Sequence, residues 1–303
     1  MTYALLVNPR AGGAAVAAAD AARTVLEGAG HAVEVMLCEG PAATRAAVSA
    51  ACGRGGVVVA VGGDGTVSSI AGIVTELGGV MGLVPAGRGN DFARMLAIPG
   101  EPGDAARVLL EGRVEQVDLI ACTVPGAAGG AAQVVAGSVY AGVDARAVEL
   151  VARMRWLPTF LHYPVAAIRA LATYTPVDAE VVVDGVSHCF GAATVVVANS
   201  AYYGAGMQIA PDASVTDGLL DVVVVASSSR RALITAMPTI YRGRHVLRDD
   251  VVVLRGRVVE LHGSPRVPMG GDGEPLPDLP ARDAAPARIE ALPGALKVLV
   301  PRP

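Results

Sequence analysis

A glycine-rich loop that directly follows an apolar run is the part of this sequence best suited to chemistry. The run Val57–Val61 has the continuous apolar character of a buried strand, and Gly62–Thr66 follows it as Gly-Gly-Asp-Gly-Thr. Glycines let a backbone turn sharply and approach a ligand, and the predicted helix Thr66–Leu77 would aim its N–H groups and positive dipole end at phosphate. The residues that could contact a phosphate-bearing ligand here are Gly62, Gly63, Asp64, Gly65, Thr66, Val67 and Ser68.

Asp64 and Thr66 carry the polar side chains of this loop. Asp64 could orient the loop, bind a ribose hydroxyl or reach Mg²⁺ through water, and Thr66 could cap the helix or contact phosphate. The alternative is an ordinary tight turn between a strand and a helix, in which Asp64 only caps.

Two further loops of turn-forming residues follow predicted strands. Asn8–Gly13 comes after Tyr3–Val7, and Pro85–Asp91 comes after Val80–Val84. The carboxyl ends of parallel strands meet at one sheet edge, where open α/β sheets bind ligands, so a nucleotide site is the preferred interpretation. For Asn90 and Asp91 the alternative to nucleotide binding is that they cap the helix that follows. The candidate contacts are Asn8, Pro9, Arg10, Ala11, Gly12, Arg88, Asn90 and Asp91.

The first 119 residues alternate strand and helix patterns. Helices are predicted at 14–27, 41–51, 66–77, 90–96 and 104–111, the last with Asp104 as its N-cap, and further strands at 31–37 and 80–84. This order predicts an α/β domain with a parallel sheet covered by helices on both faces.

Strand patterns dominate residues 120–286. Asp184-Gly185 joins two short β-branched segments as a hairpin turn, and Arg230–Met237 is the one clear helix. We therefore expect a second, mostly antiparallel β domain. Pro275–Pro286 is expected to be a proline-rich connector, after which residues 287–303 could return to the first domain.

Composition excludes several classes of protein. The 303 residues are 52% hydrophobic and carry a net charge of -4, which does not suit a nucleic-acid binder. Lys297 is the only lysine, so neither a P-loop nor a protein-kinase site is possible. The four cysteines are scattered, and no histidine pair has metal-ligand spacing. The N-terminus has no signal-peptide pattern, so a cytoplasmic location is expected.

At the level of whole motifs the chain resembles the diacylglycerol kinase catalytic family, which includes bacterial lipid kinases, sphingosine kinases and ceramide kinases. VNPRAGG, GGDGTVSSIAGIV and PAGRGNDFAR resemble its three nucleotide-binding motifs. SVYAGVD, ANSAYYGAGMQIA, PDASVTDGLLD and MGGDGEPLP resemble its later blocks, so the match runs in order through nearly the whole chain. GGDGT alone is less specific, because NAD kinases share it.

The resemblance implies a fold and an activity. The first domain would be like NAD kinase and phosphofructokinase, the second a β-sandwich, and the active site would lie in the cleft between them. ATP and Mg²⁺ would be the cofactors and a lipid hydroxyl the phosphate acceptor. Glu274 would be the general base with Asp272 close by, because a lipid hydroxyl must lose its proton as it attacks phosphorus. A structural Mg²⁺ would be held by Asp217 with backbone groups of Ser214 and Leu219.

These acidic residues could instead have purely structural roles, in an acidic hairpin turn at 272–274 and in a β-turn at Asp217-Gly218. The chain also departs from the family. Arg88 stands where many members have threonine, and a family threonine near Leu37–Cys38 is absent, with Thr44 on the next predicted helix. A NAD kinase-like small-molecule kinase and a catalytically silent nucleotide- or lipid-binding protein are the competing functions.

The expected partners are a lipid with a free hydroxyl and, transiently, a membrane surface. Leu150–Tyr174 holds the only tryptophan and several arginines, so it could touch a bilayer, although packing on the β domain is the favoured interpretation. No nucleic-acid partner is expected, and an exposed sheet edge could support a homodimer.

Overall fold

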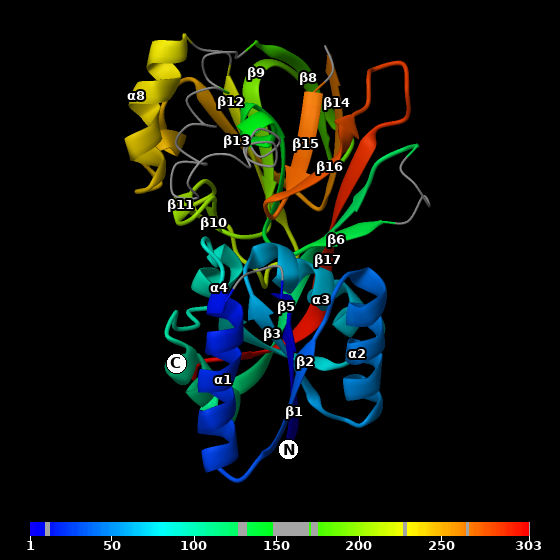
Figure 1. The fold of residues 1–303 in the computed structure, drawn as a ribbon. Coiled ribbons are helices and arrows are strands. Elements are labelled where there is room, and N and C mark those ends of the chain that lie inside the picture. Colours follow the sequence, from blue (N-terminus) through cyan, green and yellow to red (C-terminus); the bar gives the residue numbers. More distant parts are fainter. Residues whose placement is uncertain are drawn as a thin grey trace.

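The structure, a computed structural model, describes residues 1–9, 13–126, 132–147, 170, 175–226, 229–264 and 267–302. Its two domains lie one above the other in Figure 1. The first is built on four parallel strands in the order β2-β1-β3-β4. These strands are β1 (Thr2–Val7), β2 (Ala32–Leu37), β3 (Val57–Gly62) and β4 (Val80–Pro85).

Helices cover this sheet as the sequence predicts. α1 (Gly13–Gly28) packs with α5 (Pro102–Glu111), and α2 (Pro41–Gly53) packs with α3 (Asp64–Glu76). Every residue of β3 is buried, as expected for a strand with helices on both sides. The loop after β3 therefore has a fixed position at the carboxyl edge of the sheet.

The second domain is an antiparallel β-sandwich. The inward residues of its strands form one core of mostly valine, alanine and leucine, and β8 (Val177–Val183) alternates buried with less buried positions. Its other main strands are β7 (Ser138–Gly142), β9 (Val186–Ala198), β12 (Leu220–Ala226), β13 (Val251–Gly256), β14 (Val258–Ser264), β15 (Val267–Gly271) and β16 (Glu274–Leu279).

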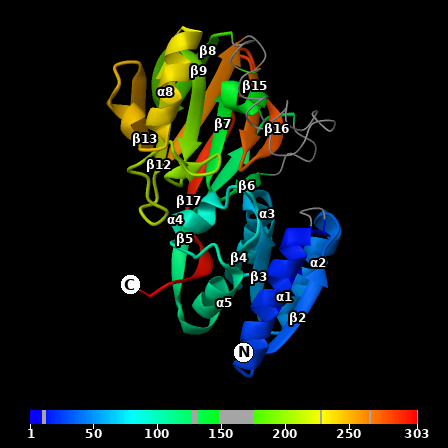
Figure 2. The same cartoon turned by 60° about the vertical axis from the view of Figure 1, so that its left-hand side comes forward.

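Two long strands connect the domains. β5 (Arg113–Thr123) and β17 (Ala287–Val300) pair antiparallel, with an irregularity between Leu292 and Leu296. The first part of β17 pairs with β14 of the sandwich, and its last part pairs in parallel with β4. Figure 2 shows β17 running from one domain into the other, so the two sheets are continuous.

Two helices, a small hairpin and a short 3-10 helix lie outside these sheets. α4 (Asp91–Met95) lies at the junction of the domains, and β10 (Tyr202–Tyr203) pairs with β11 (Met207–Gln208) in a small hairpin beside it. α8 (Arg230–Ile240) covers the outside of the sandwich and is followed by the short helix η3 (Arg244–Leu247). None of the described helices is long and apolar enough to cross a bilayer.

The predicted fold class, an α/β domain with a second β-sandwich domain, is confirmed, but two local predictions are wrong. Asp104 does not cap its helix, which already begins at Pro102 with Glu101 at the N-cap position. Pro275–Pro286 is not simply a connector, because its first residues belong to β16. Prolines are tolerated there because β16 ends the order of strands in the sheet. The helix predicted over Arg230–Met237 is confirmed, and it continues past Pro238 to Ile240.

Candidate active site

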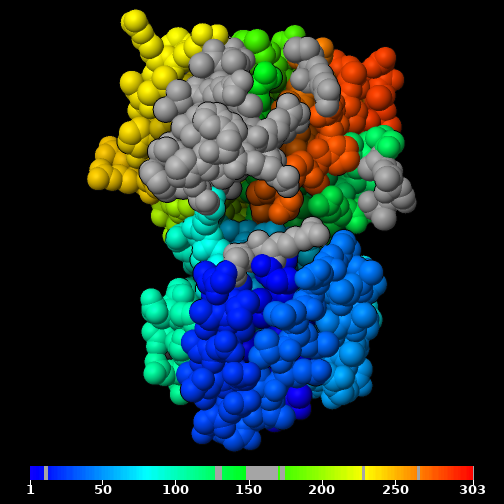
Figure 3. All heavy atoms as spheres, viewed as in Figure 1, coloured from blue at the N-terminus to red at the C-terminus, as the bar shows by residue number. Residues whose placement is uncertain are grey.

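A cleft of about 630 Å³ lies between the two domains and collects residues from both. Figure 3 shows the outer surface narrowing to a waist at this level. Of the residues predicted from the sequence, those that line the cleft are Asn8, Gly65, Thr66, Ser68, Asp272 and Glu274. The cleft therefore has the first-domain loops on one wall and the 272–274 turn on the other.

The two glycine-rich loops of the first domain touch each other through their backbones. A Cβ atom placed on Gly87 would lie 2.3 Å from the Cα atom of Gly63. Asn90, which has a left-handed φ of 54°, closes the second loop by accepting from the Gly87 amide at 2.9 Å and donating to its carbonyl at 3.0 Å. Asn90 thus shapes the loop in this structure and does not line the cleft.

Gly87→Ala should lower the free energy of unfolding by about 1–3 kcal/mol, because the new methyl group has no room beside Gly63. Urea unfolding measures this change. The matched control is Gly53→Ala on α2, where a Cβ meets nothing within 4 Å and where alanine should be neutral or slightly stabilising. Equal effects of the two substitutions would contradict the close contact.

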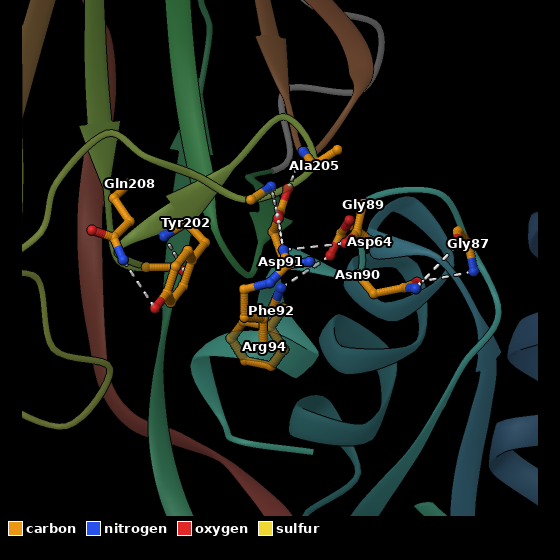
Figure 4. A network of polar contacts seen from close by, with 12 residues as sticks. Asp64, Gly87, Gly89, Asn90, Asp91, Phe92, Arg94, Tyr202, Ala205 and Gln208 are labelled. Carbon is orange, nitrogen blue, oxygen red and sulfur yellow. Dashed lines mark hydrogen bonds and ion pairs between the residues drawn. The ribbon is translucent and has the colours of Figure 1, made fainter. Parts of the chain in front are cut away.

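Asp64 is largely buried at the start of α3, behind the cleft wall. Its Oδ1 accepts from the Phe92 amide at 3.0 Å, and its other oxygen faces Gly89 close to the carboxylate of Asp91 (Figure 4). Burial raises the pKa of Asp64 to about 6, helped by the charges of Asp91 and Asp272 and opposed by the hydrogen bond from Phe92. Its carboxylate therefore links α3 to α4, a role different from simple capping.

The raised pKa of Asp64 predicts a pH-dependent stability. The folded protein holds this proton more tightly than the unfolded chain does, so stability is lost as pH rises from about 4 to about 6. Between pH 4 and pH 7 the wild type should lose about 2 kcal/mol relative to Asp64→Asn, measured by urea unfolding at both pH values. Asp283→Asn, at an exposed site, should follow the wild type. A difference that does not change with pH would contradict the burial of this charge.

Asp91 connects the two domains. Its carboxylate accepts from the Ala205 and Gly206 amides of the β10–β11 hairpin, both at 2.8 Å, and from Arg94 at 2.5 Å (Figure 4). Arg94 in turn stands over the ring of Tyr202, with its Cζ atom 5.6 Å from the ring centre. Asp91 does not line the cleft. Its hydrogen bonds instead hold the β10–β11 hairpin of the second domain against α4 of the first.

Glu274 is exposed on the sandwich side of the cleft, at the first residue of β16. It lies so close to the first turn of α3 that a Cβ atom on Gly65 would be 3.0 Å from its Oε1. The glycine of the first domain thus leaves room for the carboxylate of the second. Glu274 therefore lies in the cleft opposite the start of α3.

Asp272 sits two residues earlier in a different environment. Its carboxylate accepts from Ser68 of α3 and from the amides of Ala136, Gly137 and Ser138 at 2.8–3.1 Å. Burial raises its pKa, and these hydrogen bonds oppose the rise. Asp272 therefore fastens the turn that carries Glu274 to both domains.

The three residues predicted to hold a structural metal lie outside the cleft. Asp217 accepts from the Leu219 amide at 3.0 Å and pairs with Arg255, while the Ser214 hydroxyl contacts Thr216. Among the described residues, no group of three or more His, Cys, Asp or Glu side chains could hold a metal ion. Arg255 also lies 3.6 Å from Asp221, whose buried Oδ2 has no hydrogen-bond partner among those residues. An unsatisfied buried carboxylate oxygen is compatible with a cation held mainly by backbone groups and water.

An apolar cavity of about 90 Å³ lies inside the second domain, under α8. Asp144 lies half-buried in its wall and accepts from Thr194 at 2.8 Å and from the Tyr203 hydroxyl at 3.3 Å, and desolvation raises its pKa. Tyr203 packs edge-on against Tyr140, whose hydroxyl accepts from the Gly273 amide at 3.0 Å. A chain of contacts thus joins this cavity to the turn beside Glu274.

Several cleft residues have no clear sequence signal, including Arg45, Glu76 and Gln133. Arg45 donates to Glu76 at 2.7 Å across the rim, and the two come from different helices. Thr44, on α2, also lines the cleft. The segment that contains Asp144 resembles a family block, but nothing in its residue spacing indicates a cavity.

The remaining predicted contacts are arranged differently. Arg10, Ala11 and Gly12 lie outside the described residues, as does nearly all of Leu150–Tyr174. Val67 is buried in the core, and Arg88 is exposed away from the cleft lining. Pro9, Gly62 and Gly63 shape the loops without lining the cleft.

Comparison with known proteins accounts for this arrangement. The diacylglycerol kinase catalytic domain matches residues 2–122, and the YegS C-terminal NAD kinase beta sandwich-like domain matches residues 137–300. A diacylglycerol kinase of Mycobacterium tuberculosis is 34% identical over 98% of this chain and 94% of its own length. The resemblance seen in the motifs is therefore confirmed.

Solved structures confirm the fold. A proposed diacylglycerol kinase from Bacillus anthracis str. Sterne superposes with a TM-score of 0.76 at 22% identity, over 99% of this chain and 97% of that one. Yeast NADH kinase complexed with NADH reaches 0.54 at 10% identity, over 100% and 84%. The α/β domain and the β-sandwich are thus shared with both.

Proposed function

The chain belongs to the diacylglycerol kinase family of lipid kinases, and we propose that it transfers the γ-phosphate of ATP to the hydroxyl of a lipid. One observation carries the proposal. Glu274 of the second domain lines the cleft opposite the first turn of α3, so close that a Cβ atom on Gly65 would lie 3.0 Å from its Oε1. A base on one wall and a helix N-terminus on the other are the parts that phosphoryl transfer needs.

The nucleotide lies on the first-domain wall. Its phosphates lie at the start of α3, beside the amide of Gly65 and the hydroxyl of Thr66, with Asn8 at the end of β1 next to them. Asp64 and Asn90 contribute indirectly, because their hydrogen bonds hold the two glycine-rich loops in place.

Glu274 acts on the acceptor. Its carboxylate takes the proton from the lipid hydroxyl as the oxygen bonds to the γ-phosphorus. The bond between that phosphorus and the bridging oxygen breaks, and ADP leaves with the electron pair. Asp272 is a positioning residue in this scheme, because its carboxylate is fully engaged by the amides beneath the turn.

Mg²⁺ bound with ATP would neutralise charge on the phosphates. Asp217, with backbone groups of Ser214 and Leu219, would hold a structural Mg²⁺; the supporting observation is that Oδ2 of Asp221, 3.6 Å from Arg255, accepts no hydrogen bond from a described residue. This ion would stabilise the segment of residues 211–221 and would take no part in phosphoryl transfer.

The acceptor enters from the second domain. The apolar cavity under α8 offers room for a short length of hydrocarbon, and its contacts through Tyr203 and Tyr140 reach the turn that carries Glu274. An acceptor with an apolar tail suits this arrangement better than a nucleotide does. The enzyme would be cytoplasmic and would meet its lipid during transient contact with a membrane surface.

Transfer of ³²P from γ-labelled ATP tests the proposal. The purified protein is assayed with Mg²⁺ on diacylglycerol, a sphingoid base and phosphatidylglycerol in mixed micelles, with NAD⁺ as a control acceptor. Label in one lipid class is expected. Label only in NAD⁺ would replace the proposal with a NAD kinase-like activity, and ATP binding without any label would favour a silent binding protein.

A further inference from the structure

The outer surface of α8 and η3 combines exposed apolar side chains with arginines. Ile234, Tyr241 and Leu247 are 55%, 53% and 78% exposed. Pro238 is exposed as well. The spacing of Ile234, Pro238 and Tyr241 puts these three residues on one side of the helix. We call this set, with the exposed arginines Arg230, Arg231, Arg242 and Arg244, the α8–η3 face.

The opposite side of α8 already has a packing partner. Leu233 and Ile240 are buried, and with Ala236 and Met237 they line the apolar cavity of the second domain. The exposed apolar stripe is therefore a second apolar side of the same helix, which folding of the described chain leaves uncovered. A helix that is apolar on its outer side and bordered by basic residues is typical of one that lies on a bilayer.

Charge supports the same partner. Residues 229–250 contain five arginines and two aspartates, in a chain whose net charge is -4. Arg248 pairs with Asp250, whereas none of the four arginines of the α8–η3 face has an ion pair with another described residue. Local positive charge on an acidic protein, placed around exposed apolar groups, is complementary to anionic lipid headgroups.

We propose that the α8–η3 face docks on the surface of an anionic bilayer, with Ile234, Tyr241 and Leu247 entering the interface and the arginines binding lipid phosphates. The inference rests on the proposed function in one respect, namely that a lipid acceptor must be drawn from a membrane. Docking in this orientation places the bilayer against the helix that forms one wall of the apolar cavity.

Vesicle sedimentation without ATP tests the proposal separately from catalysis. The full-length protein is mixed with vesicles of phosphatidylcholine and with vesicles that also contain phosphatidylglycerol. We expect binding to the anionic vesicles only, and weaker binding as salt is raised. Arg231→Gln with Arg242→Gln should weaken it about 30-fold, and Leu247→Ser should weaken it about 10-fold or more.

The matched control combines Val114→Ser with Arg302→Gln, which removes an exposed apolar group and an exposed charge from the first domain. It should bind vesicles as the wild type does. Absence of wild-type binding, or equal binding by the α8–η3 variants, would overturn the proposal and leave an acidic protein as the alternative partner. Vesicle binding through this face without phosphorylation of any lipid would instead leave the docking surface standing and overturn the proposed acceptor.

Discussion

Glu274→Gln should reduce phosphoryl transfer by about 10²–10⁴-fold while ATP still binds. Glutamine has nearly the same size as glutamate but cannot take the proton of the attacking hydroxyl. The side chain is exposed and starts an edge strand, so the fold should tolerate the change. Single-turnover transfer from labelled ATP measures the rate, and nucleotide titration measures binding.

Two further variants sharpen this result. Glu111→Gln neutralises an exposed glutamate on α5, outside the cleft lining, and should have wild-type activity. Glu274→Asp keeps the base but withdraws it from α3, and should be impaired less than the glutamine variant. Wild-type turnover by Glu274→Gln would show that another group, or water, removes the proton.

Asp272→Asn should lower the free energy of unfolding by about 2–4 kcal/mol and reduce activity through loss of the turn geometry. Three buried amides and Ser68 now converge on one carboxylate. Asparagine offers one acceptor oxygen in place of two, brings an N–H₂ group toward other donors and removes the charge. Urea unfolding gives the stability, and the activity assay should show a lower kcat.

The chain contains a matched control for this substitution. Asp184 also precedes a glycine in a hairpin turn, also has a left-handed backbone with φ of 47° against 46° for Asp272, and also accepts from backbone amides. Asp184 is exposed, so Asp184→Asn should cost less than about 1 kcal/mol. Similar losses at the two turns would mean that the turn itself, and not the buried network around Asp272, determines stability.

The first domain was predictable because its signals are local. Three of its four strands, β1, β3 and β4, are almost wholly buried and appear in the sequence as apolar runs, such as Val57–Val61, that end in loops of turn-forming residues. The carboxyl edge of the sheet then follows from topology alone. The shared cleft position of Asn8, Gly65 and Thr66 follows from that edge.

The rest of the site depends on contacts between residues far apart in the sequence. The partners of Asp272 lie more than 130 positions away, and Asp91 reaches amides of a hairpin that has no periodic pattern. The two prolines of β16 argue against a strand in the sequence, because only the assembled sheet shows that, within the described residues, β16 pairs with β15 alone. Predictions for Glu274 and Asp217 therefore depended on resemblance to a family.

The exchange of strands between the domains sets limits on how this enzyme can be divided. The last residues of β17 cover an edge of β4, so a fragment that stops after β5 would present an unpaired strand edge in the first domain, a site for aggregation. The sandwich alone would carry the same segment with nothing to pair. Neither half is a self-sufficient module, and gene truncation or domain transplantation at the junction should yield insoluble products, whereas the intact chain should unfold as one cooperative unit.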